Sequence, residues 1–309
     1  MSVRYAYLGP EGTFSEAALR SISEAADAER LPCVSVADSL DAVRRGDVLA
    51  ALVPLENSVE GSVAETLDEL ASGEPLQIVR EVQLQVSFAL LVRSGTTLDS
   101  IATVTTMPHA EAQVRGWLRR TLPDAKFIAA ASTADGARAV AAGEADAAVA
   151  APLAAERYSL DVLADDIADT PGAVTRFVLV SRPVSPPPVT GADRTTVVAY
   201  IAEDHPGALL ELLTELAVRG VNLTRIESRP TGVGLGRYCF SIDAEGHIGQ
   251  ERVGEALAAM KRLCADVRFL GSYPTADGTK IGERPGISDM AFKDAKRWVE
   301  TLQAGETSE

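Results

Sequence analysis

The stretch SVADSLDAVRRGDVLAAL, residues 35–52, decides the fold, because a similar stretch, STADGARAVAAGEADAAV, occupies residues 132–149. The two stretches align at a constant offset of 97 residues, and Gly46 matches Gly143. Each copy is typical of a helix that ends at its glycine and is followed by a buried apolar strand. The repeat therefore predicts two similar α/β lobes.

A second apolar run, Phe177–Val180, predicts a buried strand that returns to the first lobe. The first lobe then comprises about residues 2–75 with 176–182, and the second comprises residues 76–175. Two lobes joined by crossing strands leave a cleft between them, which is a common place for a ligand. Thr175 would lie at this crossing, where a hydroxyl held on rigid backbone suits an oxygen-rich anion.

The N-terminal strand, Val3–Leu8, leads through a glycine-containing turn into a helix expected over residues 17–28. The free N–H groups at the start of that helix suit a carboxylate ligand. Thr13 and Ser15 lie at this helix start, and each can equally be a plain helix cap.

A polar cluster, Glu56-Asn57-Ser58, follows the strand of the first repeat and precedes a helix expected over residues 63–70. The ends of strands in open α/β sheets are where such sheets bind ligands. The alternative is that Asn57 or Ser58 caps the helix, and a cap residue can still face a cleft.

Prolines concentrate in residues 183–193, which predicts a stiff linker between domains. Beyond the linker the pattern changes to the order βαββαβ over residues 194–275, which is the ferredoxin-like arrangement. The expected strands are 195–202, 222–228, 238–244 and 267–272, the expected helices are 208–219 and 252–263, and a glycine-rich loop is expected at 230–236. In the tail, residues 276–309, we expect a short helix over 288–302 and disorder over 304–309.

Composition excludes several classes of function. Among 309 residues, 44 are acidic and 29 are basic, so the net charge of −15 opposes general binding of nucleic acid or of anionic membranes. Three lone cysteines, without Cys-x-x-Cys spacing, indicate a reducing compartment, and the three histidines form no metal-ligand pattern. The histidine pattern predicts that no metal is bound. The absence of a signal-peptide pattern and of a long apolar run predicts a cytoplasmic protein.

Four stretches together resemble a known family. Tyr7–Ser15, Val53–Gly61 and Thr175–Phe177 are similar to motifs of prephenate dehydratase. Glu227–Pro230, with Pro206–Leu210 upstream, resembles the regulatory ACT domain that is attached to that enzyme.

The resemblance implies a catalytic domain over residues 1–182 with the topology of type II periplasmic binding proteins, followed by an ACT domain over 194–275. It implies a lyase that converts prephenate to phenylpyruvate, water and carbon dioxide without a cofactor. It further implies feedback inhibition by L-phenylalanine and a homo-oligomer, either a dimer or a tetramer. An edge or open face of the small sheet would suit such pairing.

The resemblance also implies site residues. Thr175 is expected to donate a proton or hydrogen bond to the departing hydroxyl. The residues expected to bind substrate are Thr13, Phe14, Ser15, Glu56, Asn57, Ser58, Arg176 and Phe177. The residues expected to bind phenylalanine are His205, Pro206, Gly207, Ala208, Leu209, Glu227, Ser228, Arg229 and Pro230.

Five of these residues also keep an alternative. Arg176 either binds a substrate carboxylate or pairs with an acidic residue. Glu56 beside an anionic substrate is useful only if it is protonated or orients a neighbour. Phe177 suits core packing, and Gly207 and Pro230 can simply shape turns.

The sequence departs from the family pattern in two places. Ala173 stands where the family commonly has asparagine, and Met107 stands where it often has histidine, so histidine-based catalysis is not expected. His109 lies nearby, and no role is transferred to it.

Two rival functions remain. An arogenate dehydratase would share the mechanism and differ in recognising an amino group, and a non-catalytic sensor of aromatic metabolites would have no need for Thr175-Arg176.

Overall fold

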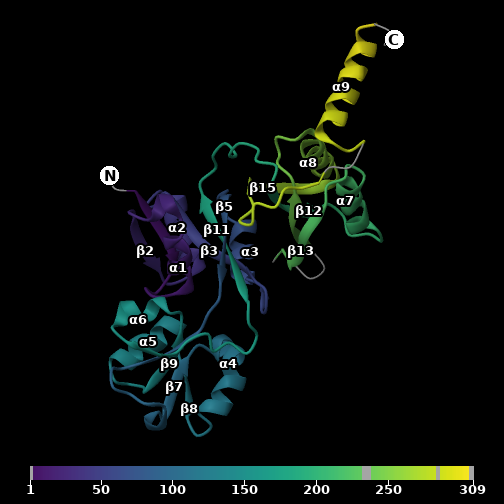
Figure 1. Ribbon diagram of the computed structural model, residues 1–309. Helices are drawn as coiled ribbons and strands as arrows, with labels where there is room; N and C mark the ends of the chain where they lie inside the picture. The colour runs from purple at the N-terminus through teal and green to yellow at the C-terminus, as the bar shows by residue number, and fades with distance from the viewer. Residues whose placement is uncertain (1–2, 232–237, 283–285, 306–309) are drawn as a thin grey trace. The chain divides into compact units, whose positions relative to one another are not determined.

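The computed structural model describes residues 3–231, 238–282 and 286–305 (Figure 1). By its internal contacts the chain divides into two units. The first comprises the residues up to Glu69 together with Val82–Val180, and the second comprises Leu70–Glu81 together with the residues from Ser181 onward. The segment Leu70–Glu81 thus belongs by contact to the C-terminal unit, although first-unit residues flank it in sequence.

The first sheet has the strand order β2-β1-β3-β11-β5, with a short strand β4 paired to β3. Its strands are β1 (Arg4–Leu8), β2 (Glu29–Cys33), β3 (Ala50–Asn57), β4 (Gly61–Ser62), β5 (Gln77–Gln85) and β11 (Val174–Ser181). β1 runs parallel to β2 and to β3. β11 follows the whole second lobe in sequence and yet lies between β3 and β5, as the apolar run predicted.

The second sheet has the order β10-β6-β9-β7-β8. Its strands are β6 (Ala89–Val92), β7 (Thr103–Thr106), β8 (Lys126–Ala129), β9 (Ala147–Ala150) and β10 (Asp161–Ala164). The helices of the two lobes are α1 (Phe14–Arg20), α2 (Val36–Arg45), α3 (Ala64–Ala71), α4 (Pro108–Thr121), α5 (Thr133–Ala141) and α6 (Leu153–Tyr158), with 3-10 turns at Ser23–Ala25 and Leu98–Ser100. The chain crosses between the lobes in β5 and in β11.

The sequence repeat reappears as matching backbone geometry. Ser35 caps α2 by accepting the N–H of Asp38, and Ser132 caps α5 by accepting the N–H of Asp135, each at 3.0 Å. The two serines have φ/ψ of −143/166 and −144/167. The two glycines that follow the helices both take a left-handed φ of about 80°. The same local signals therefore begin and end the equivalent helix in each lobe.

The helix expected over residues 17–28 is wrong at both ends. α1 begins at Phe14 and ends at Arg20, because Ile22 takes an extended conformation that buries its side chain. The Ser21 hydroxyl donates to the carbonyl of Ala18 at 2.7 Å, which satisfies one of the open carbonyls at this end.

The second unit contains the expected βαββαβ order. Its elements are β12 (Asp193–Ile201), α7 (Ala208–Ala217), β13 (Leu223–Pro230), β14 (Tyr238–Glu245), α8 (Glu251–Leu263) and β15 (Cys264–Pro274). They form an antiparallel sheet of order β13-β14-β12-β15, so the ferredoxin-like prediction is confirmed. Apolar side chains of α7 and α8, among them Leu212 and Met260, pack against Val197 and Ile242 of the sheet.

The remaining predictions for this unit concern its loop and tail. Most of the glycine-rich loop, residues 232–237, and the last residues, 306–309, lie outside the described residues. The tail helix α9 (Asp289–Gln303) is capped by Ser288, whose hydroxyl accepts the N–H of Ala291 at 3.2 Å.

The equivalence of the two helix caps can be tested by stability. We expect Ser35→Ala and Ser132→Ala each to cost about 1 kcal/mol, because each removes the only side-chain acceptor of its helix start. Urea unfolding followed by circular dichroism measures the effect, and Ser185→Ala in the exposed linker is the control. Unequal losses, with one variant matching the control, would contradict the equivalence.

Candidate active site

Two polar residues from distant parts of the chain meet at the centre of the first sheet. Asn57 ends β3, and Thr175 lies near the start of the adjacent strand β11. The side-chain amide of Asn57 donates a hydrogen bond to the Thr175 hydroxyl oxygen at 2.9 Å. Thr175 is buried, with 9% of its surface exposed. The contact joins a residue of the polar cluster to the predicted catalytic residue.

The orientation of the Asn57 amide is fixed by its other end. Its oxygen accepts the backbone N–H groups of Val59 at 2.8 Å and of Glu60 at 3.0 Å. Because the oxygen is held by two donors, the NH₂ group must point to Thr175. The Thr175 hydroxyl therefore accepts one hydrogen bond and keeps its own proton to donate, and none of the described residues accepts that proton.

Ser58 joins the loop after β3 to the start of β11 through two hydrogen bonds. Its backbone N–H donates to the carbonyl of Val174 at 2.9 Å, and its hydroxyl accepts the N–H of Val174 at 3.0 Å. This reciprocal pair holds Thr175 in register with Asn57, which supports a positioning role for Ser58.

Arg176 and Glu56 occupy the next positions on the same two strands. One guanidinium nitrogen of Arg176 lies 3.5 Å from a carboxylate oxygen of Glu56. Arg176 is buried, whereas the Glu56 side chain is 38% exposed. Of the two alternatives for Arg176, the pairing with an acidic residue is present, and its contact with a substrate carboxylate stays a prediction.

The turn before α1 carries the other predicted substrate-binding residues. Thr13 is buried and caps the helix: its hydroxyl accepts the N–H of Glu16 at 3.4 Å and donates to the carbonyl of Leu8 at 3.1 Å. Ser15 is also buried, in the first turn of the helix. The plain capping role of Thr13 is thus present, and ligand binding at this turn stays a prediction.

Sequence reasoning did not identify Glu16 at this turn. Only 3% of Glu16 is exposed, and its carboxylate accepts the N–H of Gly12 at 2.6 Å while pairing with Arg20 at 2.9 Å. The spacing Glu16–Arg20 is an (i, i+4) pair visible in the sequence. Nothing in the sequence indicates that the carboxylate folds back onto the turn.

The two predicted aromatic residues pack into apolar surroundings. Phe177 is 2% exposed, in agreement with its core-packing alternative. Phe14 reaches from the first lobe to Phe88 of the second, with ring centroids 5.4 Å apart and an edge-to-face angle of 89°. Binding of substrate by these two rings stays a prediction.

The two positions that depart from the family pattern lie in one apolar cluster. Ala173 is buried in the core of the second lobe, and Met107 and Phe14 pack against that core. His109 lies 72% exposed, with its Nδ1 3.5 Å from a carboxylate oxygen of Glu60. Glu60 is in turn hydrogen-bonded through its backbone N–H to Asn57, and any role of His109 stays untested.

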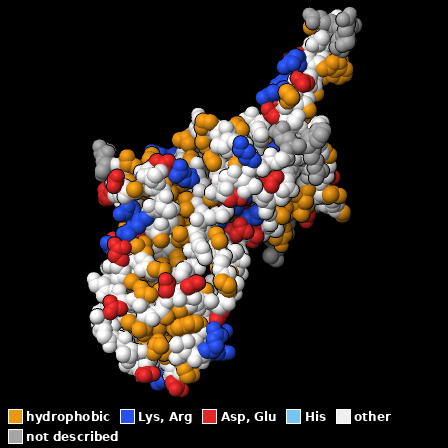
Figure 2. Space-filling model, viewed as in Figure 1, with side chains coloured by type: hydrophobic (Ala, Val, Ile, Leu, Met, Phe, Trp, Pro, Cys, Tyr) orange, Lys and Arg blue, Asp and Glu red, His pale blue; other side chains and the backbone are white. Residues whose placement is uncertain are grey.

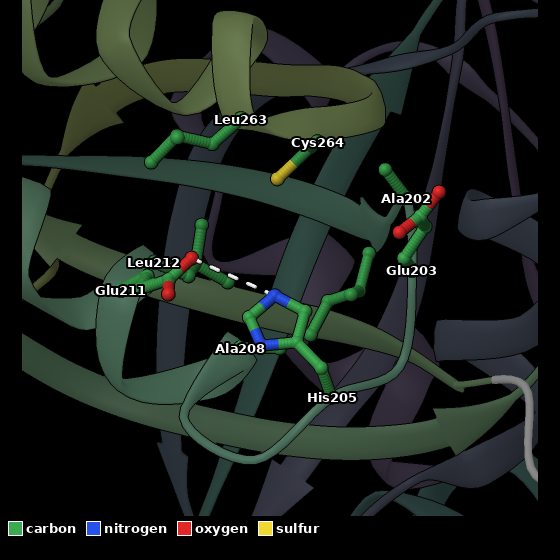
Figure 3. Close-up of a pocket in the computed structure, with 9 residues that line it drawn as sticks. Ala202, Glu203, His205, Ala208, Glu211, Leu212, Leu263 and Cys264 are labelled. Atoms are coloured by element: carbon green, nitrogen blue, oxygen red, sulfur yellow. Dashed lines mark ion pairs between the residues drawn. The ribbon is translucent and has the colours of Figure 1, made fainter.

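A separate cavity lies in the C-terminal unit and contains part of the predicted effector set. It measures about 190 Å³ and is lined by residues that include His205, Ala208, Glu211 and Cys264 (Figure 3). His205 Nε2 points to a carboxylate oxygen of Glu211, 3.7 Å away. Burial raises the pKa of the Cys264 thiol, so this group stays protonated.

The remaining effector residues lie at the start of α7 and at the end of β13, which is the edge strand opposite β15 in the small sheet. Gly207 has φ +96 and begins α7 without a side-chain cap, while the N–H of Ala208 donates to the carbonyl of His205 at 3.1 Å. Glu227, Ser228, Arg229 and Pro230 end β13 and do not line the cavity within one chain.

The described part of the chain has neither a metal-binding cluster nor a membrane-spanning helix. Residues 3–231, 238–282 and 286–305 contain no group of three or more His, Cys, Asp or Glu that could hold a metal ion. Within the same residues, no helix is both long enough and apolar enough to cross a membrane.

Family models match both parts of the chain. The model described as prephenate dehydratase matches residues 5–185, and the ACT domain model matches residues 196–262.

Individual proteins agree with these models. A prephenate dehydratase of Amycolatopsis methanolica is 52% identical over 304 residues, covering 98% of this chain and 99% of that protein. A crystal structure of prephenate dehydratase from Arthrobacter aurescens in complex with L-Phe has a TM-score of 0.93 at 50% identity, covering 98% of this chain and 100% of that one. A quorum-quenching acylase, GqqA, has a TM-score of 0.80 at 32% identity, covering 88% and 98%. The chain belongs to the prephenate dehydratase family.

Proposed function

We propose that this chain converts prephenate to phenylpyruvate, carbon dioxide and water, with Thr175 as the proton donor. The observation that carries the assignment is the hydrogen bond from Asn57 to the Thr175 hydroxyl oxygen at 2.9 Å. The family supplies the reaction class, and the contact identifies the hydroxyl that has a proton to give.

The reaction requires two things from the protein, which are a proton and rigid binding of the substrate. The C–CO₂ bond breaks, its electron pair completes the aromatic ring, and the ring C–OH bond breaks. The leaving hydroxide takes the Thr175 proton and departs as water, and the net reaction consumes one proton, which solvent returns to Thr175. A threonine hydroxyl is a weak acid, so the negative charge that develops on its oxygen needs a donor already in place.

Asn57 is that donor in this proposal. Its NH₂ group already points to the Thr175 oxygen, and its own oxygen is held by the N–H groups of Val59 and Glu60. The hydrogen bond therefore strengthens as charge develops, without a reorganisation of the site.

The substrate is a dianion, whereas the chain carries a net charge of −15. Hydrogen-bond donors and cations at the site must therefore offset the repulsion between the anionic substrate and the negatively charged chain. Arg176 is the buried cation next to Thr175, and we propose that it binds one carboxylate while Glu56 keeps its guanidinium in place. Thr13, Ser15 and the backbone of their turn are proposed for the second carboxylate, together with Ser58.

The role of the hydroxyl is tested by two substitutions at one position. Thr175→Ala is expected to lower kcat for phenylpyruvate formation by at least ~100-fold, because it removes the proton donor. Thr175→Ser, which keeps the hydroxyl, should retain most of the activity.

The matched control is Ser181→Ala, which removes a buried hydroxyl from the other end of β11. This variant should retain parental kcat. Near-parental activity of a folded Thr175→Ala enzyme would mean that another residue supplies the proton.

We further propose that L-phenylalanine inhibits the enzyme by binding to the C-terminal domain. The support is that a relative 50% identical to this chain was crystallised with L-Phe. In this chain the start of α7 at Gly207–Leu209 lacks a side-chain cap, and a helix start of this kind suits a carboxylate; His205, Pro206 and the residues 227–230 complete the proposed site.

The contacts of Leu70–Glu81 suggest how such binding reaches the catalytic strands. The Arg268 guanidinium donates to the carbonyls of Ser72 at 2.6 Å and Gly73 at 3.0 Å, just beyond the end of α3. The Tyr200 hydroxyl donates to the carbonyl of Ala71. Strands β12 and β15 of the small sheet thus hold the segment that leads into β5.

A buried ion pair lies further along the same segment. The Glu81 side chain is fully buried, pairs with Arg194 of β12 and accepts the N–H of Ala276 at 3.3 Å. The next residue, Val82, continues β5, the first of the two strands that cross between the lobes. A change in the small sheet can therefore bias the crossing strand without passing through the proline-rich linker.

This route predicts a selective loss of regulation. Arg268→Gln should raise the phenylalanine concentration for half-inhibition by about fivefold or more, because two hydrogen bonds that couple the sheet to residues 72–73 are lost. Steady-state assays with and without phenylalanine measure it, and Arg262→Gln on the exposed side of α8 is the control. Unchanged inhibition of Arg268→Gln would exclude this route.

The proposed phenylalanine site also bears on how two copies of the chain would pair. β13 is an edge strand of the small sheet, and its Ile226 is 41% exposed. On α7 and at its C-terminal end, Leu210 and Val218 are 68% and 64% exposed. Hydrophobic side chains are visible over α7 in Figure 2. We propose that this edge pairs with a second copy of the chain, which would bring Glu227–Pro230 of one copy to Gly207 of the other.

The division into domains is likewise proposed: a catalytic domain over 1–182, a linker over 183–193, the ACT domain over 194–275 and the tail over 276–309. We place the enzyme in the cytoplasm, where the free thiols Cys33, Cys239 and Cys264 stay reduced.

A further inference from the structure

The tail helix α9 is anchored to α8 at its N-terminal end. The Asp289 carboxylate accepts the backbone N–H of Glu251 at 2.5 Å, at the start of α8, which has no side-chain cap of its own. Just before α9, Ile287 packs onto Gly220, where an added Cβ would lie 3.0 Å from the Cβ of the isoleucine. Lys296 lies one turn further along, with its Nζ 3.8 Å from a carboxylate oxygen of Glu251. These contacts fix where α9 begins.

The rest of α9 is exposed to solvent. Residues 293–300 are all exposed, and none of the residues of this helix is buried. Figure 1 shows the helix leading away from α8 toward the C-terminus. A helix of 15 residues gains little stability from its own hydrogen bonds, because isolated helices of about 12–15 residues are marginal in water. Burial of its apolar side chains is therefore what could stabilise it further.

The apolar side chains of α9 form one stripe. Four residues with spacings of three, four and three share one face of the helix: Phe292, Ala295, Val299 and Leu302. Phe292 is half-buried, whereas Val299 and Leu302 are 44% and 46% exposed. Figure 2 shows hydrophobic side chains on the surface of this helix. Apolar side chains at this spacing normally face a partner, because burial against it removes them from water.

The spacing of the stripe reads the same in both directions, which favours a second copy of α9 as its partner. Two copies that lie antiparallel place Phe292 of one copy opposite Leu302 of the other. The same arrangement places the small Ala295 opposite Val299, so the two helices can approach closely. A surface that is complementary to itself in this way is what a two-fold symmetric interface requires.

The charges of α9 fit the same arrangement. The helix carries three acidic and three basic residues, so it lacks the basic face that an anionic membrane or nucleic acid would need. Lys293 and Glu300 lie on the same side of the stripe, and antiparallel pairing brings Lys293 of one copy level with Glu300 of the other. A parallel pair would instead place each of these charges beside its own copy. Lys296, near the middle of the pair, keeps Glu251 as its partner within one chain.

From this pattern we propose that α9 pairs with α9 of a second copy of this chain, as an antiparallel two-helix contact. The interface is separate from the β13 edge, and it does not rest on the proposed reaction. Two-fold pairing at β13 and two-fold pairing at α9 together give a tetramer, as a dimer of dimers. One helix pair is small beside the roughly 1,200–2,000 Å² that a stable interface buries, so the tetramer should dissociate at low protein concentration.

The mass of the full-length protein in solution tests the proposal. Val299→Glu/Leu302→Glu places carboxylates on both sides of the contact, and both positions are exposed, so the rest of the chain should fold as in the parent. Sedimentation equilibrium over a range of concentrations should give this variant half the mass of the parent. The matched control is Met290→Glu/Ala304→Glu, which adds the same charge at exposed positions on the opposite face of α9 and should keep the parental mass.

Trp298 supplies an optical readout of the same contact. Its side chain is 52% exposed beside the stripe, so pairing of the helices would cover it. The chain has two tryptophans, and Trp117→Phe leaves Trp298 as the only one. Its emission should move to longer wavelength when the protein is diluted, and also when Val299→Glu/Leu302→Glu is added.

A charge exchange tests the antiparallel orientation. Glu300→Lys should raise the dissociation constant of the tetramer about threefold, because it places one lysine level with Lys293 of the other copy. The double variant Lys293→Glu/Glu300→Lys should restore the parental value. A double variant that is no tighter than Glu300→Lys alone would contradict the antiparallel arrangement.

Equal masses for Val299→Glu/Leu302→Glu and for its control would overturn the proposal. A parent that is monomeric at every concentration would overturn it as well. If the parent is a dimer and Val299→Glu/Leu302→Glu is a monomer, the pairing of α9 is supported and the proposed pairing of β13 edges fails. These masses are measured without substrate, so an absence of prephenate turnover would count against the proposed function alone.

Discussion

The site depends on the position of β11 between β3 and β5. Because the chain returns to the first sheet after completing the second lobe, residues 57 and 175 become neighbours. The hydrogen bond from Asn57 to Thr175 follows from this return, as do the bonds between Ser58 and Val174. Polar groups at this place must be paired or must have a function, since the strand around them is buried. Thr175 accepts a hydrogen bond and retains a proton to donate, which is the state that an acid requires.

Two ion pairs, each with one buried member, lie in this part of the first unit, although the chain as a whole is acidic. Arg176 is buried beside Glu56, and Glu16 is buried beside Arg20. Each pair costs desolvation and is retained where the backbone must keep one conformation. In the first pair the cation is fixed next to the proposed reaction centre. In the second, the carboxylate fixes the turn before α1.

Much of the architecture could be predicted from the sequence, because its signals are local. Ser35 and Ser132 both begin a helix, and Gly46 and Gly143 both take the left-handed conformation after one. The early end of α1 was missed, because burial of Ile22 by distant residues decided it. Asn57 and Thr175 were each named from the sequence, but their hydrogen bond could not be, since it depends on strand order and register. The same holds for the contacts of Leu70–Glu81 with the small sheet, which join residues about 130 to 200 positions apart in the sequence.

We propose that Asn57 and Thr175 act as one unit in donating the proton. A double-mutant cycle on kcat for phenylpyruvate formation, with Asn57→Ala, Thr175→Ala and the double variant, tests it directly. If the two residues act as a unit, Asn57→Ala lowers kcat by about tenfold or more in the parent and has little further effect once the Thr175 hydroxyl is gone. Losses that multiply in the double variant would show that the two residues act separately.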